Sequence, residues 1–199
     1  MTQLNKKQSN SLKDYILHLD HWIPKSILDE TLKELSDEKN WKEHTYFNQS
    51  TFKDVVVNKD KEPYVCYGDN LTHLKSLKHL IWTALDKYIR IDKISGASHS
   101  NWNGFSQIRF NKYNKNQIMS KHTDHILSLF TGERRGIPVL SIVCLLNDDY
   151  GGGEFIMFDD YEIKFKAGDM IIFPSVFLYP HLVKPVTKGN RYSFVSWCY

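Results

Sequence analysis

His122 and Asp124 are the residues of this sequence whose types and spacing most directly suggest chemistry. They lie two positions apart, so on a strand or at its end both side chains project from the same face. An imidazole nitrogen and a carboxylate oxygen could then share one metal ion. His181, in the strand-like run Pro180–Val183, could join them only through tertiary folding. Two histidines and one carboxylate on one face of a metal are typical of non-haem Fe(II) oxygenases.

Each part of this set also has an ordinary explanation. An H-x-D triplet occurs in polar turns, and a lone histidine such as His181 is often a core residue with satisfied hydrogen bonds. The sequence therefore supports the metal site through the combination and order of the residues rather than through any one of them.

Arg191 extends the pattern, because it begins a run in which Arg191, Ser193, Val195 and Trp197 share one face of a strand. A buried guanidinium needs an anion, since an unpaired buried charge is costly. One partner would be the 5-carboxylate of 2-oxoglutarate, whose other end can chelate iron. The alternative is an ion pair with a structural Asp or Glu.

The elements that must position these residues differ between the two halves of the chain. Apolar residues at helical spacing predict helices at Ser26–Glu38 and Leu71–Ile91. Between them, the aromatic-rich region Trp41–Asn70 has strand-like runs at Asp54–Asn58 and Tyr64–Tyr67. A long irregular stretch inside a compact domain is often functional, so we expect a lid there.

From Gly104 onward the period changes to two, which predicts eight short strands. These are Phe105–Tyr113, Ile118–Lys121, Val139–Asn147, Glu154–Phe158, Glu162–Phe165, Asp169–Phe173, His181–Val186 and Arg191–Trp197. Even spacing of this kind favours a jelly roll or a barrel. We therefore expect a single domain over residues 1–199: a mainly β, cupin-like jelly roll at 101–199, with helical support and the lid at 1–100.

The C-terminal half resembles a known family over about 90 residues. The resemblance rests on His122-Thr123-Asp124, on Leu145–Phe155 with its Gly151–Gly153 turn, on Ala167–Ser175, and on His181–Arg191 followed by Trp197. In order and spacing these segments are similar to the Fe(II)/2-oxoglutarate-dependent oxygenases of the prolyl 4-hydroxylase-like group, in particular the PKHD-type hydroxylases.

The resemblance implies a double-stranded β-helix and a dioxygenase that takes Fe(II), 2-oxoglutarate and O2, with ascorbate as a reductant. It implies that His122, Asp124 and His181 bind the iron and act in catalysis. It also implies that Arg191 binds the 5-carboxylate of 2-oxoglutarate and that Tyr113 donates its hydroxyl to the same molecule, although Tyr113 could equally be a packing residue. Some relatives have tyrosines where this chain has Met119 and Leu145, so we expect a more apolar cosubstrate pocket.

The resemblance also suggests the substrate. A prolyl residue of a peptide or protein is the first expectation, with succinate and CO2 as co-products. The rivals are a free amino acid or other small molecule, and a non-enzymatic jelly-roll binding module. We expect Trp197 to contact the substrate, and Arg134 and Arg135 to do so from a mobile flap unless they are solvated surface. His125 would point away from the metal.

Composition limits the remaining possibilities. The chain has 199 residues, a formal net charge of +3 and 41% hydrophobic residues, which is an ordinary globular composition. The weak charge, and the lack of a second arginine after Arg191, disfavour a nucleic-acid demethylase. Three cysteines without paired spacing disfavour disulfides and structural zinc. With no signal-like or membrane-spanning run, we expect a cytoplasmic protein, and the lysine-rich composition suggests an AT-rich bacterial or phage genome.

Overall fold

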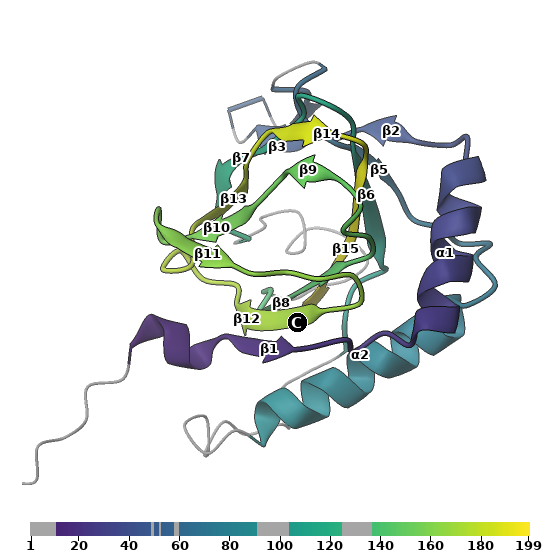
Figure 1. Cartoon of the computed structure of the whole chain (residues 1–199). Coiled ribbons are helices and arrows are strands. Elements are labelled where there is room, and N and C mark those ends of the chain that lie inside the picture. Colours follow the sequence, from purple (N-terminus) through teal and green to yellow (C-terminus); the bar gives the residue numbers. More distant parts are fainter. Residues whose placement is uncertain (1–10, 49, 52, 58–59, 91–103, 125–136) are drawn as a thin grey trace, which may run out of the picture.

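The computed structural model describes residues 11–199 apart from 49, 52, 58–59, 91–103 and 125–136. Two antiparallel sheets face each other across an interior, with two helices outside (Figure 1). The order of the larger sheet is β1-β12-β8-β15-β6-β5-β2, and that of the smaller is β11-β10-β13-β7. This arrangement is the predicted jelly roll, or double-stranded β-helix, with flanking N-terminal helices.

The larger sheet consists of β1 (Leu17–Leu19), β2 (Lys42–Glu43), β5 (Tyr64–Cys66), β6 (Arg109–Tyr113), β8 (Leu140–Leu145), β12 (Met170–Pro174) and β15 (Arg191–Cys198). The smaller sheet consists of β7 (Met119–His122), β10 (Phe155–Met157), β11 (Tyr161–Ile163) and β13 (His181–Val183). Two further pairs are β9 (Gly151–Gly152) with β14 (Val186–Lys188), and β3 (Tyr46–Asn48) with β4 (Lys53–Val55).

The helices are a short 3-10 turn η1 (Leu12–Tyr15), α1 (Lys25–Asp37) and α2 (Leu74–Ile89). Both α-helices lie close to their predicted bounds and cover the outer face of the larger sheet (Figure 1). Leu35 of α1, Leu77 and Ile81 of α2, and Phe110 and Phe194 of the sheet are fully buried in one cluster. Burial of these side chains is the main force that holds the helices against the sheet.

The last strand, β15, confirms the predicted alternation. Phe194 and Cys198 pack in the cluster under the helices, whereas Val195 and Trp197 pack in a second cluster between the two sheets. Every residue of β15 is buried, because both of its faces are covered. Arg191 therefore begins a strand whose odd-numbered side chains face the interior.

The predicted strand His181–Val186 is in fact two strands, β13 and β14, which belong to different sheets. Pro185 lies between them, and proline has no N–H group to donate to a sheet ladder. The break lets β14 pair with β9, and there the carbonyl of Pro185 accepts a hydrogen bond from Gly153. A Cβ on Gly152 would lie 2.3 Å from that carbonyl oxygen, so the glycine run is required for this close approach.

Parts of the Trp41–Asn70 region belong to regular structure. β5 pairs with β6 and β2 pairs with β5, so they extend the larger sheet, while β3 and β4 form a separate antiparallel pair.

The three cysteines are free and buried. Within the described ranges, no helix has both the length and the apolar character needed to cross a membrane.

Candidate active site

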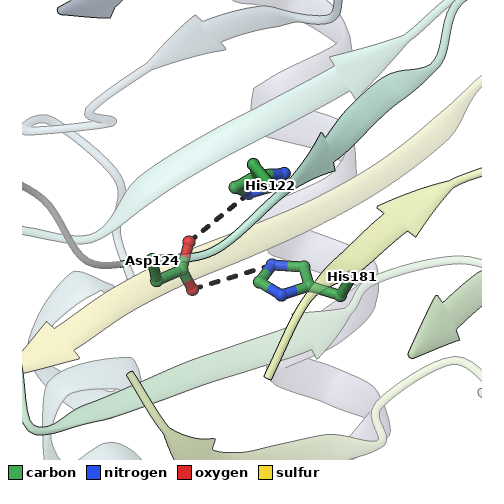
Figure 2. Close-up of side chains that lie close together, drawn as sticks. All are labelled: His122, Asp124 and His181. Carbon is green, nitrogen blue, oxygen red and sulfur yellow. Dashed lines mark ion pairs between the residues drawn. The ribbon is translucent and has the colours of Figure 1, made fainter. Parts of the chain in front are cut away.

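Two paired strands bring the two histidines together. His122 ends β7 and His181 begins β13, and these residues are direct partners in the antiparallel register. Asp124 follows β7 by two residues and projects into the same space. Figure 2 shows both imidazole rings directed toward the Asp124 carboxylate. The tertiary convergence on which the metal prediction depends is therefore present.

The ligand atoms are held at distances that suit a shared cation. The Nε2 atom of His122 lies 3.4 Å from Oδ1 of Asp124, and Nε2 of His181 lies 3.7 Å from Oδ2 (Figure 2). One ligand atom from each residue lies within 4.8 Å of the others. Asp124 and His181 are both buried.

Backbone carbonyls fix the orientation of both rings. Nδ1 of His122 lies 2.8 Å from the carbonyl of Ser120, and Nδ1 of His181 lies 3.1 Å from that of Tyr179. A carbonyl can only accept, so Nδ1 carries the proton in each neutral ring and the lone pair is on Nε2. Both lone pairs then face a carboxylate. Backbone contacts of this kind are typical partners of metal-binding histidines.

The electrostatics of the site also fit a bound cation. Oδ2 of Asp124 is buried without a hydrogen-bond partner. Burial would raise the pKa of Asp124, but His181 and His122 hold it well below its usual range. Burial lowers the pKa of His181 to about 4, so this ring is neutral near pH 7. For His122, burial alone would lower the pKa, but the hydrogen bond and charge of Asp124 raise it.

When both rings are neutral, two Nε2 lone pairs and a carboxylate oxygen thus converge on one point. A divalent ion satisfies all three, and two imidazoles with one carboxylate form the ligand set of non-haem Fe(II) centres. The residues present therefore fit Fe(II).

Arg191 lies in the interior beside Tyr113. It is 1% exposed, and its guanidinium lies over the Tyr113 ring at 5.0 Å from the centroid. Nη1 donates to Ser193 Oγ at 3.0 Å, while Nε is buried without a partner. In the part of the chain that the structure describes, Arg191 forms no ion pair with an Asp or Glu. Its unpartnered Nε is therefore available to an anion.

The wall around Arg191 is largely apolar. Leu145 is buried opposite Ser193; Met119 is also buried, at the start of β7 beside Tyr46 and Val183. Gly153 has a positive φ, and a Cβ there would lie 3.0 Å from Cδ of Arg191. Tyr113 is buried and its pKa is raised by burial, although the charges of Arg191 and Arg109 oppose the shift. Its hydroxyl is protonated and able to donate.

A buried glutamate that sequence patterns do not reveal anchors the region before β5 to β7, the strand that ends at His122. Glu62 is 4% exposed, and its carboxylate accepts hydrogen bonds from Ser120 Oγ (2.6 Å) and the Tyr46 hydroxyl (3.1 Å). The Tyr46 ring lies 6.5 Å from the His122 ring. In the sequence Glu62 looks like an ordinary surface acid beside a proline, so the sequence gives no signal that it is buried near the site.

Of the remaining predicted site residues, Trp197 faces the interior, and its Nε1 is buried without a partner. Arg134 and Arg135 lie outside the described residues, as does His125, which was predicted to be a non-ligand.

Comparisons with known proteins agree with this geometry. Residues 108–199 match the model of the 2OG-Fe(II) oxygenase superfamily. A PKHD-type hydroxylase of Aliarcobacter butzleri (strain RM4018) is 28% identical over 189 residues, covering 92% of this chain and 77% of the relative. A PKHD-type hydroxylase of Xylella fastidiosa (strain M12) is 38% identical over 99 residues, covering 45% of this chain and 42% of the relative.

The match to the second relative therefore spans less than half of that protein.

Among solved structures, a prolyl hydroxylase from Trichoplax adhaerens, in complex with a hypoxia-inducible-factor peptide fragment, has a TM-score of 0.71. It is 16% identical and covers 94% of this chain and 84% of that one, which shows the shared fold. The chain is therefore similar, over residues 108–199, to the 2OG-Fe(II) oxygenase superfamily and, over most of its length, to a PKHD-type hydroxylase, and its interior His-Asp-His set agrees with both likenesses.

Proposed function

We propose that this chain hydroxylates an unactivated C–H bond of a prolyl residue in a peptide or protein, using Fe(II), 2-oxoglutarate and O2 and releasing succinate and CO2. The observation that carries the proposal is the buried convergence of His122, Asp124 and His181, in which Oδ2 of Asp124 has no partner. The names of the relatives and the fold of peptide-binding prolyl hydroxylases support the choice of substrate.

In this proposal each residue has a definite task. The Nε2 atoms of His122 and His181 and the carboxylate of Asp124 hold the metal, and the backbone carbonyls behind the rings keep both lone pairs pointed at it. Arg191 and Tyr113 bind the distal carboxylate of 2-oxoglutarate, for which the planar guanidinium offers two parallel donors. When bound, iron with 2-oxoglutarate and O2 supplies the oxidising power that converts C–H into C–OH.

The apolar interior protects this chemistry. Phe155 stacks on the His181 ring with centroids 5.2 Å apart, and Phe173 contacts the same ring edge-on at 5.2 Å. Met157 and Val195 line the same buried cluster. These side chains exclude water from one side of the ligand set, which strengthens electrostatic interactions within it.

We further propose that the Trp41–Asn70 region covers the bound substrate. Tyr46 and His44 support this, because their rings lie 4.6 Å apart beside His122. A second candidate function, hydroxylation of a free amino acid or other small molecule, is favoured by the guanidinium of Arg109, which faces the interior over the Trp197 ring.

The test is a panel of proline-containing peptides and free amino acids, incubated with Fe(II), 2-oxoglutarate and ascorbate as reductant. Mass spectrometry should show the gain of one oxygen atom, matched by succinate formation. His122→Ala, Asp124→Ala and His181→Ala should each abolish both signals, while His18→Ala, at an exterior histidine, should leave them unchanged. Full activity in any of the three site variants would refute that residue as a required ligand.

A further inference from the structure

A second guanidinium, that of Arg109, faces the same interior as Arg191. The β6–β15 register pairs Arg191 with Tyr113, Ser193 with Asn111 and Val195 with Arg109. Paired residues project from the same face of a sheet, and Val195 and Tyr113 both pack between the sheets. Arg109 therefore lies on the interior face at the opposite end of this ladder from Arg191.

Nothing in the described part of the chain neutralises Arg109 directly. Its guanidinium lies over the Trp197 ring at 4.9 Å from the centroid, and its buried Nε has no hydrogen-bond partner. No described carboxylate is close enough to form an ion pair with it. Burial lowers the pKa of Arg109 despite the opposing charge of Asp124, which is itself turned toward the two histidines. Arg109 is half-buried, and its unpartnered Nε makes it well placed to bind an external anion.

The groups around Arg109 have unused hydrogen-bonding capacity as well. Trp197 Nε1 and His44 Nδ1 are both buried without partners. Burial and then the charge of Arg109 lower the pKa of His44 to about 3, so the ring is neutral and still offers one N–H. Arg109 comes from β6, Trp197 from β15 and His44 from the link between β2 and β3, and the charge of Asp124 acts on both Arg109 and His44.

Arg109 and Arg191 cannot serve the same carboxylate. Their ladder positions are four residues apart, which is about 13 Å along a strand. The side chains also diverge, because Arg191 lies over Tyr113 whereas Arg109 lies over Trp197, further along β15. The interior thus has two cationic ends, and 2-oxoglutarate at Arg191 leaves Arg109 for another molecule.

We propose that Arg109 is a specificity-determining residue that binds a carboxylate of the substrate, with Trp197 and His44 beside it. The inference rests on the proposed function and narrows it to substrates that carry a carboxylate near the reacting carbon. The planar fork of arginine matches a carboxylate in a bidentate pair. Two sources offer this chemistry: the α-carboxylate of a free amino acid, and an acidic side chain or chain end of a peptide.

The experiment uses the full chain loaded with Mn(II), a redox-stable substitute for Fe(II), and saturated with 2-oxoglutarate. Calorimetry compares acid and amide pairs: N-acetyl-proline with its amide, N-acetyl-leucine with its amide, and a Pro-Glu peptide with its Pro-Gln counterpart. The wild-type protein should bind the acid member of at least one pair roughly 10- to 100-fold more tightly, as expected for hydrogen bonds to a charged group. The pair that discriminates identifies the source of the carboxylate.

Arg109→Gln should remove that discrimination and leave 2-oxoglutarate binding unchanged, and Arg109→Lys should restore part of it because the charge remains. The matched control, Arg191→Gln, should weaken 2-oxoglutarate binding instead. Equal binding of acids and amides by the wild type, no binding of any acid, or weaker 2-oxoglutarate binding in Arg109→Gln would overturn the inference. A wild-type protein that binds neither Mn(II) nor 2-oxoglutarate would refute the proposed function instead. The comparison of acids with amides in the wild-type protein tests the inference even if a variant fails to fold.

Discussion

Two groups of histidine and carboxylate in this molecule look alike by proximity alone. His122, Asp124 and His181 lie between the sheets, whereas His18, Asp20 and Asp169 lie beside β1 and the turn before β12. In both groups the candidate ligand atoms lie within 4.8 Å of one another. Their hydrogen bonding is nevertheless opposite.

In the exterior group the buried carboxylate is already satisfied. Asp169 accepts hydrogen bonds from the backbone N–H groups of His21 (2.7 Å) and Lys166 (2.8 Å), and its Oδ2 lies 3.1 Å from Nε2 of His18. In the interior group Oδ2 of Asp124 has no partner. Unmet hydrogen-bonding capacity, rather than closeness of ligand atoms, therefore distinguishes a site built for a metal from one built for a turn.

The comparison predicts, first, that only the interior group binds metal. His122→Ala, Asp124→Ala and His181→Ala should each weaken Mn(II) binding by more than about 100-fold, since loss of an outer partner alone costs 10- to 100-fold. His18→Ala should leave the affinity unchanged. Electron paramagnetic resonance of free Mn(II) measures the affinity. Comparable losses of affinity from variants in the two groups would contradict the claim that only the interior group binds metal.

The second prediction concerns stability without metal. Asp169→Ala should lower the free energy of unfolding by about 3 kcal/mol, because it leaves two backbone donors and an imidazole without their acceptor. Asp124→Ala should cost less than about 1 kcal/mol in the metal-free protein, because it also removes an unsatisfied buried oxygen. Urea unfolding of both variants checks the order, and the reverse order would contradict the assignment of the two groups.

Third, metal should stabilise the fold through the interior group alone. Mn(II) at 100 times its dissociation constant should raise the free energy of unfolding by about 2.7 kcal/mol, since it binds the folded state. A chelator should reverse the effect. Asp124→Ala should abolish it and His18→Ala should retain it, as measured by thermal unfolding with and without Mn(II).

Fourth, His44 should make the metal-free fold sensitive to acid. Its folded pKa of about 3 lies below the ordinary value of 6.5, so the unfolded chain takes up a proton first as the pH falls. The stability from neutral His44 is complete above pH 6.5 and is lost on the way to about pH 3, by about 2 kcal/mol at pH 5. His44→Gln should reduce this loss, whereas the exposed His79→Gln should not. If the free energy of unfolding depended on pH in the same way in both variants, the effect assigned to the burial of His44 would be contradicted.

Much of the fold was predictable because local patterns persist in the structure. The stripes of α1 and α2 and the period-two runs of β6, β8 and β15 formed as expected, since each buries one or two apolar faces. β1 was missed because its three half-buried residues show no pattern without β12 beside them. β14 was merged with β13 because the effect of Pro185 on pairing depends on which strand lies opposite.

The sequence by itself determined the candidate ligands, the interior face of the last strand and the family resemblance, because spacing within a strand and the order of motifs are local properties. Only the tertiary structure decided that His181 meets His122 across a strand pair, that Asp124 keeps an unpartnered oxygen, that Glu62 bonds to the strand of His122, and that Arg109 faces the same interior as Arg191. These facts depend on register and burial. The role of a charged residue depends on whether folding places a partner beside it.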